Sequence, residues 1–246
     1  MLRIISDVLD LIYPPRCMGC SVMGPGIQNG FCPGCENELV GISSTVVCRQ
    51  CAMPVGEGAS CPHCQGRGVF PITEIAAMGP FRDPVKRLIH QMKYQHRWPV
   101  AETLADRMLN QPRIRELLDQ TDVLVPMPLH WVRQIGRGFN QADAVAKRIS
   151  QKTGILLARP ITRVRNTAAQ TSVKSRAARK LNVRNAFALK TSDKIAGKRV
   201  TLVDDVLTTA STIKAAARVM READPLCINA LVIAIGDPRG RGFETV

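Results

Sequence analysis

The sequence predicts an α/β fold, in which a parallel sheet is flanked by helices and preceded by a small cysteine-rich module. Beyond residue 70, short apolar runs that suit buried strands alternate with amphipathic stretches that suit helices. Before residue 70, cysteine is concentrated, because eight of the nine cysteines lie within residues 17–64. Cysteines stop and charged residues become frequent near residue 70. We therefore expect the cysteine-rich module at 16–69 and the α/β domain at 70–246.

Residues 1–15 predict a short N-terminal amphipathic helix. Apolar residues recur at helical spacing from Leu2 to Ile12, and Pro14 and Pro15 end the stripe. The stretch lacks the small-residue cleavage site of a secretory signal. No apolar run in the sequence reaches the length that spans a bilayer. We expect a cytoplasmic protein without membrane insertion.

The cysteines form Cys-x-x-Cys pairs, each of which places two thiolates on one tight turn. The pairs are Cys17/Cys20, Cys32/Cys35, Cys48/Cys51 and Cys61/Cys64. Two such turns supply the four sulfur ligands that Zn²⁺ prefers in tetrahedral geometry. Gaps of 11 residues (21–31) and 9 residues (52–60) each leave room for a short hairpin. We predict two tandem zinc ribbons with two structural Zn²⁺. Spacing also permits a cross-braced arrangement, in which the first turn pairs with the third and the second with the fourth.

Zinc explains these cysteines better than disulfides do. Disulfides persist in oxidising compartments, and the sequence shows no secretory signal. A module this short and rich in Gly and Pro has little core of its own. Zinc binding supplies about 10–16 kcal/mol of folding free energy in comparable peptides. We therefore expect the zinc to be structural.

Positive charge is concentrated in the second half of the chain. The net charge is +14, and residues 1–70 hold 4 basic and 5 acidic residues, a net of −1, so residues 71–246 carry +15. Residues 129–184 contain 13 Lys or Arg and one acid, Asp143. A block of this kind indicates a polyanionic partner such as nucleic acid or pyrophosphate.

The first half of the α/β domain predicts strands and helices in alternation. Strands are expected at 72–81 and 123–125, and helices at 83–94, 98–109 and 114–118. On the first of these helices, His90 and Lys93 lie away from the apolar stripe, as does His96 just beyond it. We expect all three side chains in solvent.

A glycine-rich block follows the strand at 123–125. Gly136 and Gly138 would let the backbone turn close to a ligand, and Arg133 and Arg137 would bring charge. Asn140 would cap a helix that continues to residue 153. In a parallel α/β sheet this is a strand-end loop, the place where ligands bind.

The next stretch, 159–184, is basic and poor in large apolar residues. It predicts a mobile loop followed by a short helix over the active face. Strands are expected at 187–189, 200–203 and 227–235, and Cys227 is expected in the core.

The stretch 199–213 joins a buried strand, two acids, a hydroxyl-rich loop and a helix. Asp204 and Asp205 end the predicted strand, and a helix is expected at 213–223. The loop residues between them are Thr208, Thr209, Ala210, Ser211 and Thr212. Unpaired N–H groups at a helix start favour an anion, and carboxylates accept bonds from sugar hydroxyls or hold Mg²⁺ through water. The stretch predicts a cradle for a phosphorylated sugar.

This stretch resembles the loop of type I phosphoribosyltransferases that binds phosphoribosyl pyrophosphate (PRPP) with Mg²⁺. The resemblance implies that Asp204 and Asp205 meet the ribose 2′- and 3′-hydroxyls and act in catalysis. It also implies that residues 208–212 wrap the 5′-phosphate, while Arg133 or Arg137 offsets charge on departing pyrophosphate. Position 210 is Ala where the pattern has Gly. If that residue needs positive φ, the alanine strains the loop.

The whole chain is similar to the ComF/GntX family. The likeness rests on the cysteine-rich head, the 126–141 block with RGFNQ, a following Arg163, Gln170, Arg176, Asn182 pattern, and VDDVLTTAST. It implies a type I phosphoribosyltransferase-like domain and a role in DNA uptake or in nutritional use of DNA. It also implies handling of single-stranded DNA in the cytoplasm, with a DNA-translocating helicase as partner. The candidate DNA contacts are Arg163, Arg165, Lys174, Arg176, Arg179 and Lys180.

Two functions from different classes remain open at this point. The first is a protein that handles nucleic acid and reuses a PRPP or phosphosugar site. The alternative is a PRPP-dependent phosphoribosyltransferase that acts on an acceptor the sequence does not identify. The basic block holds only Trp131 and Phe139 as aromatics, a small set for base stacking.

Overall fold

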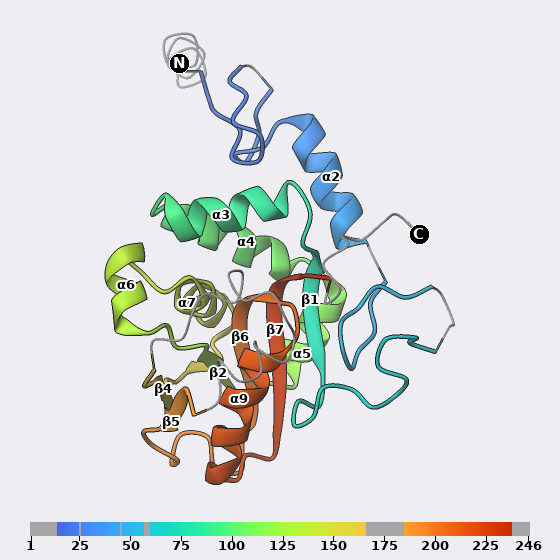
Figure 1. The fold of residues 1–246 in the computed structure, drawn as a ribbon. Coiled ribbons are helices and arrows are strands. Elements are labelled where there is room, and N and C mark those ends of the chain that lie inside the picture. The colour runs from blue at the N-terminus through green and yellow to red at the C-terminus, as the bar shows by residue number, and fades with distance from the viewer. Residues whose placement is uncertain (1–13, 25, 45, 57–59, 166–184, 238–246) are drawn as a thin grey trace.

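A computed structural model describes residues 14–24, 26–44, 46–56, 60–165 and 185–237. The predicted helix at 1–15 lies almost entirely outside these residues. The main sheet has the strand order β1-β7-β6-β2-β3, and every neighbouring pair is parallel. Figure 1 shows β1, β7, β6 and β2 in this order. Its strands are β1 (Ile75–Pro80), β2 (Val123–Pro126), β3 (Leu156–Leu157), β6 (Arg199–Leu207) and β7 (Cys227–Ile235). The predicted parallel α/β fold is confirmed.

Apolar side chains that alternate along the strands divide the core into two layers. On β1, Ile75 and Ala77 belong to one layer, and Ala76 and Met78 belong to the other. The second layer packs against four helices: α3 (Val85–Tyr94), α4 (Trp98–Leu109), α5 (Pro112–Asp119) and α7 (Gln141–Thr153). The first layer packs against α9 (Ser211–Met220). A 3-10 turn, η2 (Arg221–Ala223), continues α9. Both faces of the sheet are therefore covered, as the apolar strands require.

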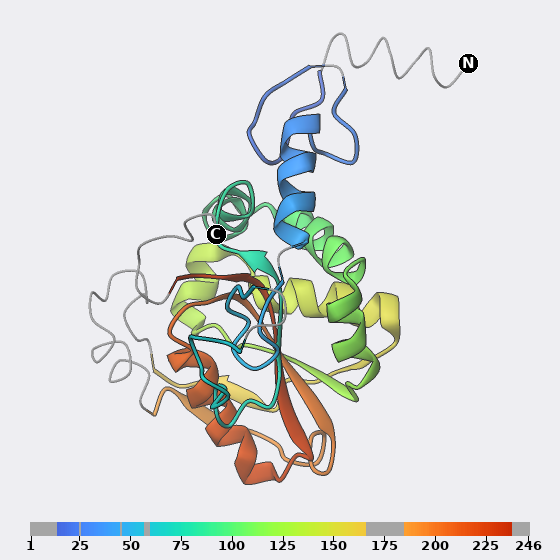
Figure 2. The same cartoon turned by 90° about the vertical axis from the view of Figure 1, so that its right-hand side faces the viewer.

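The cysteine-rich module packs against the same two layers. Phe31, with Leu39 and Ile42 of α2 (Pro33–Ser43), joins the layer that contains α3 and α4, while Ala52 and Met53 join the layer that contains α9. Figure 2 shows α2 standing on the domain, with the chain that precedes it at the far end. Polar contacts add to the junction, because Arg107 pairs with Glu36 and the Gln91 side chain donates to the Met18 carbonyl at 2.6 Å.

Three local predictions were wrong. Strand β6 runs through Asp204 and Asp205 to Leu207, because its pairing with β7 continues to Ile235. A short helix, α6 (Trp131–Arg137), occupies most of the predicted glycine-rich loop, and Gly138 ends it with φ 72°. Strand β4 (Ile161–Arg163) lies in the predicted mobile loop, because it pairs in an antiparallel manner with β5 (Phe187–Leu189).

Cys227 is half-buried at the start of β7, so the prediction of a core position was also wrong. Within the described part of the chain, no helix combines the length and the apolar character needed to cross a membrane.

Candidate functional site

The eight cysteines of the N-terminal module form two separate clusters. One contains Cys17, Cys20, Cys32 and Cys35, and the other contains Cys48, Cys51, Cys61 and Cys64. Within each cluster all four sulfurs lie within 4.8 Å of one another. The turns therefore pair in sequence, first with second and third with fourth. The cross-braced alternative is not the observed arrangement.

The sulfur geometry fits tetrahedral zinc. A Zn–S bond of about 2.3 Å places the sulfurs of a tetrahedral site about 3.8 Å apart. The observed Sγ–Sγ distances are 3.6 Å for Cys20 and Cys32, and 3.5 Å for Cys51 and Cys61. The Cys32 backbone N–H also donates to Cys17 Sγ at 3.3 Å, a bond that stabilises a thiolate. Both clusters can hold Zn²⁺, and both sit beside the core layers that they help to assemble.

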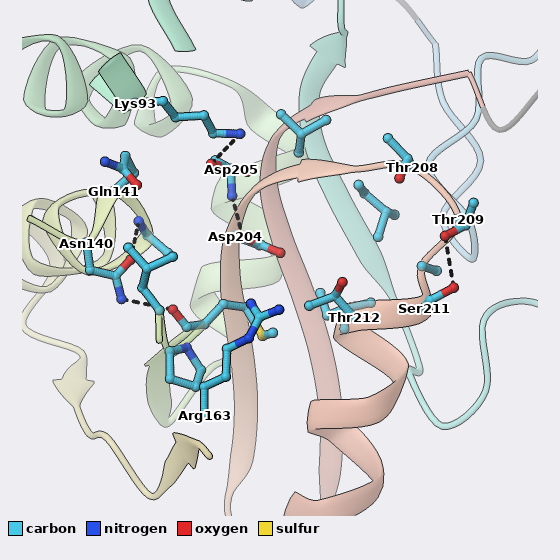
Figure 3. A pocket seen from close by; sticks show the side chains of 18 of the residues that line it. Lys93, Asn140, Gln141, Arg163, Asp204, Asp205, Thr208, Thr209, Ser211 and Thr212 are labelled. Atoms are coloured by element: carbon cyan, nitrogen blue, oxygen red, sulfur yellow. Dashed lines mark hydrogen bonds and ion pairs between the residues drawn. The ribbon is translucent and has the colours of Figure 1, made fainter. Parts of the chain in front are cut away.

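A pocket opens where β6 ends, and we call it the β6 pocket (Figure 3). Its walls come from β6, the loop that follows it, the start of α9, the end of α3, and the turn between α6 and α7. The polar residues that line it are Lys93, Arg137, Asn140, Gln141, Arg163, Asp204, Asp205, Thr208, Thr209, Ser211 and Thr212. The structure thus brings the acid pair, the hydroxyl loop and Arg137 together in one pocket.

The two acids differ in their surroundings. Burial, with the neighbouring Asp205 charge as the second cause, raises the pKa of Asp204 to about 7. The positive charges of Lys93 and Arg163 act in the opposite direction without cancelling this effect. Asp204 Oδ1 also accepts the Asp205 backbone N–H at 2.9 Å. Near neutral pH, Asp204 is poised between its protonated and charged forms.

Lys93 is a pocket residue that sequence reasoning placed in solvent. Its ammonium lies 2.7 Å from Asp205 Oδ2, and only 18% of its side chain is exposed. The prediction failed because Lys93 lies off the apolar stripe of α3, and periodicity shows only the face that packs on the core. The facing carboxylate comes from a strand more than a hundred residues later in the chain. His96 also has a partner, because its Nδ1 lies 2.8 Å from the Arg137 carbonyl oxygen.

The hydroxyl loop leads directly into α9. Thr209 Oγ1 and Ser211 Oγ lie 2.9 Å apart, and Ala210 has φ 58°. Position 210 is therefore left-handed, the conformation that the glycine of the resembling pattern adopts without strain. Ala210 is also the N-cap of α9, and its methyl side chain makes no capping hydrogen bond. The first turn of α9, from Ser211 to Ile213, lines the pocket.

The RGFNQ block (residues 137–141) contributes to the pocket mainly by fixing the backbone around it. Asn140 Oδ1 accepts the Ala142 backbone N–H at 3.1 Å and so caps α7, as predicted. Its Nδ2 donates to the Met127 carbonyl at 2.9 Å, which holds the end of β2. Gln141 is 2% exposed, and its Nε2 donates to the Met92 carbonyl at 3.2 Å. These bonds fix the end of α3, which carries Lys93, against the start of α7.

The predicted basic contacts separate into three groups. Arg163, expected to contact DNA, lines the β6 pocket, and its guanidinium lies 5.6 Å from the Phe187 ring centre. Arg165 is exposed outside the pocket lining. Arg133 lies on α6, and its side chain lies outside the described part of the structure. The remaining residues of this set lie wholly outside the described part of the chain: Gln170, Lys174, Arg176, Arg179, Lys180 and Asn182.

Comparison with protein families gives two matches that divide the chain. A double zinc ribbon domain matches residues 8–65, and a phosphoribosyl transferase domain matches residues 136–244. The sulfur clusters and the parallel sheet agree with these matches. The protein is therefore of the class that joins a double zinc ribbon to a phosphoribosyltransferase-type α/β domain.

Curated relatives resemble the chain over most of its length. DNA utilization protein YhgH of Salmonella typhi is 31% identical over 215 residues, which cover 85% of this chain and 92% of that protein. Competence protein F of Haemophilus influenzae is 29% identical, with 84% and 91% covered. Competence protein ComFC of Bacillus subtilis is 24% identical, with 78% of each covered. The chain belongs to the ComF/GntX family.

Solved structures resemble the chain more weakly. Glutamine PRPP amidotransferase from B. subtilis is 20% identical with a TM-score of 0.36. The match covers 54% of this chain and 25% of that one, so the chain spans about a quarter of that protein's length. A likeness of this size carries no functional argument.

Proposed function

We propose that the β6 pocket binds PRPP or another phosphorylated ribose, and that the protein acts in DNA uptake or DNA utilisation by handling single-stranded DNA in the cytoplasm. One observation carries the ligand proposal: the acid pair, the hydroxyl loop and the start of α9 line one pocket. The relatives named for competence and for DNA utilization support the cellular role. A DNA-translocating helicase is the partner that this role favours.

Each part of the pocket has a task in this proposal. The N–H groups at the start of α9 and the hydroxyls of Thr209 and Ser211 hold the 5′-phosphate. Asp204 and Asp205 accept hydrogen bonds from the ribose hydroxyls. Mg²⁺ bound with the ligand would neutralise phosphate charge, and carboxylates are the oxygen ligands that it prefers. These tasks need Asp204 in its charged form, so binding should strengthen as pH rises through about 7.

Calorimetry with PRPP and Mg²⁺ tests the ligand site. Wild type should release or absorb heat on binding, and Asp204→Asn/Asp205→Asn should bind at least about tenfold more weakly, because the ribose hydroxyls lose charged acceptors. Asp119→Asn is the matched control, since Asp119 is an exposed acid on α5 outside the pocket. Absence of binding in wild type would reject the site.

Single-stranded DNA binding is tested by its salt dependence. A strand that contacts about 6 phosphates should give a slope of log affinity against log salt near about −4. Arg165→Gln should make this slope shallower, because Arg165 is an exposed cation outside the pocket lining. An affinity that barely changes between low and high salt would rule out this part of the proposal.

The second candidate function is a PRPP-dependent transferase. The pocket favours it because Asp204 and Asp205 line the same pocket as Lys93, Arg137 and Arg163, cations that would offset charge on departing pyrophosphate. A PRPP-consumption assay with and without single-stranded DNA separates the two candidates. Binding without consumption supports the phosphosugar site alone, and consumption that DNA stimulates supports transfer.

A further inference from the structure

We propose that Lys93 recognises the diphosphate of a phosphoribosyl diphosphate ligand and so distinguishes that ligand from ribose 5-phosphate. This inference rests on the proposed function of the β6 pocket and adds a specificity-determining residue to it. Lys93 comes from the last turn of α3, a helix on the other side of the acid pair from the hydroxyl loop (Figure 3).

The β6 pocket offers two unlike places for anionic groups. On one side, Thr209, Ser211 and the start of α9 provide neutral donors. On the other side of the acid pair, the Lys93 ammonium provides a full positive charge. A ligand that carries a phosphate at one end and a more highly charged diphosphate at the other matches this division. A sugar monophosphate can use only one of the two places at a time.

Lys93 is held ready for such a ligand. Its Nζ lies 2.7 Å from Asp205 Oδ2, and 18% of its side chain remains exposed. An ammonium carries three donor hydrogens, so one ion pair leaves donors for a second acceptor. Asp205 therefore orients the Lys93 ammonium toward the pocket and leaves some of its donor hydrogens available for a ligand. Because the pair is largely shielded from water, its interaction with a bound anion is screened less than that of a surface lysine.

The backbone around Lys93 is fixed independently of that ion pair. The buried Gln141 side chain donates to the Met92 carbonyl, one residue before Lys93, at 3.2 Å. The other cation of this wall, Arg137, is engaged elsewhere. Its Nη1 donates to Gln141 Oε1 at 3.2 Å, and its guanidinium lies 5.8 Å from the Tyr94 ring centre. Lys93 thus faces the acid pair directly through Asp205, while Arg163 enters the same pocket from β4.

Calorimetry with separate probes tests this assignment. Wild type, Lys93→Met and Lys86→Met are titrated with PRPP, ribose 5-phosphate and inorganic pyrophosphate, each with Mg²⁺. Methionine keeps the apolar stem and removes the charge. Lys93→Met should weaken PRPP and pyrophosphate binding about tenfold or more, the loss expected for one charged hydrogen bond. Ribose 5-phosphate affinity should fall clearly less, by the part that comes from Asp204, whose pKa rises when the Lys93 charge is removed. Lys86, exposed on the same helix, is the matched control and should change neither.

The outcomes separate the two proposals. If wild type binds neither PRPP nor ribose 5-phosphate, the proposed function fails and Lys93 loses its role with it. If wild type binds PRPP and Lys93→Met binds it equally well, only the Lys93 assignment is overturned. Equal weakening of PRPP and ribose 5-phosphate would also overturn it, because that pattern indicates a general disturbance of the acid pair. Retained ribose 5-phosphate binding reports that the variant is folded.

Discussion

Asp204 should make the stability of the fold depend on pH. Its carboxyl lies one residue from a second carboxyl, and burial and that neighbouring charge raise its pKa to about 7. In the unfolded chain an aspartate has a pKa of about 3.9. Between these two values the folded protein keeps a proton that the unfolded chain has released.

The free energy of unfolding should therefore carry a penalty from Asp204 at high pH. The contribution of this group is fully favourable below about pH 4 and is lost as pH rises through about 7. Asp204→Asn removes the titration and keeps an oxygen for the Asp205 backbone N–H. The difference in unfolding free energy between the variant and wild type should shift by about 1–3 kcal/mol in favour of the variant when the pH rises from 5 to 8. This figure follows from about 1.4 kcal/mol per pKa unit.

Chemical denaturation of both proteins at saturating zinc, at pH 5 and pH 8, measures this difference. The zinc module is the same in both proteins, so its contribution to the difference cancels. Unfolding free energies that change in parallel with pH would show that Asp204 does not titrate in this range.

At the scale of elements, β6, its loop and α9 form one unit whose turn is strained at Ala210. The left-handed conformation, with φ 58°, costs a residue with a β-carbon about 1–2 kcal/mol. The turn persists because β6 is held between β2 and β7 and α9 packs on the core. Alanine at position 210, where the resembling pattern has glycine, therefore destabilises the turn.

Ala210→Gly should relieve that cost. We expect a gain of up to about 1 kcal/mol in unfolding free energy, since glycine's larger entropy loss offsets part of the relief. PRPP binding should tighten by a few-fold, because the loop reaches its bound shape without strain and without a methyl near the phosphate. Denaturation and calorimetry measure the two effects.

Ala215→Gly is the contrasting control for that experiment. Ala215 lies inside α9, where glycine should cost about 1 kcal/mol. The two substitutions should therefore shift stability in opposite directions. A loss of stability in Ala210→Gly equal to that in Ala215→Gly would show that the turn carries no strain.

At the scale of the whole molecule, the zinc module is part of the core. The first cluster contributes to the layer with α3 and α4, and the second lies beside the layer with α9. The module thus bridges the two faces of the sheet, and the ion pair of Glu36 with Arg107 ties α2 to α4. Loss of either metal should loosen the face that its cluster supports.

Paired cysteine substitutions test the sequential arrangement of the clusters. Cys20→Ser/Cys32→Ser damages one cluster only, so the chain should retain about one zinc of two. Cys20→Ser/Cys48→Ser damages both clusters, so zinc should fall close to zero. Elemental analysis of the purified proteins gives the ratio. A cross-braced protein would show the reverse result, with zinc retained in the second variant and lost from the first.

Local signals in the sequence determined much of this protein. The spacing of the cysteines, the apolar strands at 200–203 and 227–235, and the acid–hydroxyl stretch depend on residues close together in the chain. Turn chemistry and strand burial act over such short ranges, so they can be predicted from order alone. Asn140 as the cap of α7 belongs to the same group. The sequence raised a left-handed backbone at position 210 only as a condition, and the structure supplied it.

Tertiary structure decided which distant groups meet. The pairing of the cysteine turns, the contact of Lys93 with Asp205 and the entry of Arg163 into the β6 pocket all join segments far apart in sequence. Such contacts depend on the order of strands in the sheet and on which helix covers which face. Periodicity identifies the apolar face of α3 that packs on the core, but it does not say which carboxylate lies opposite its polar face. For that reason the sequence predicted the acids and the hydroxyl loop, and the fold supplied the lysine.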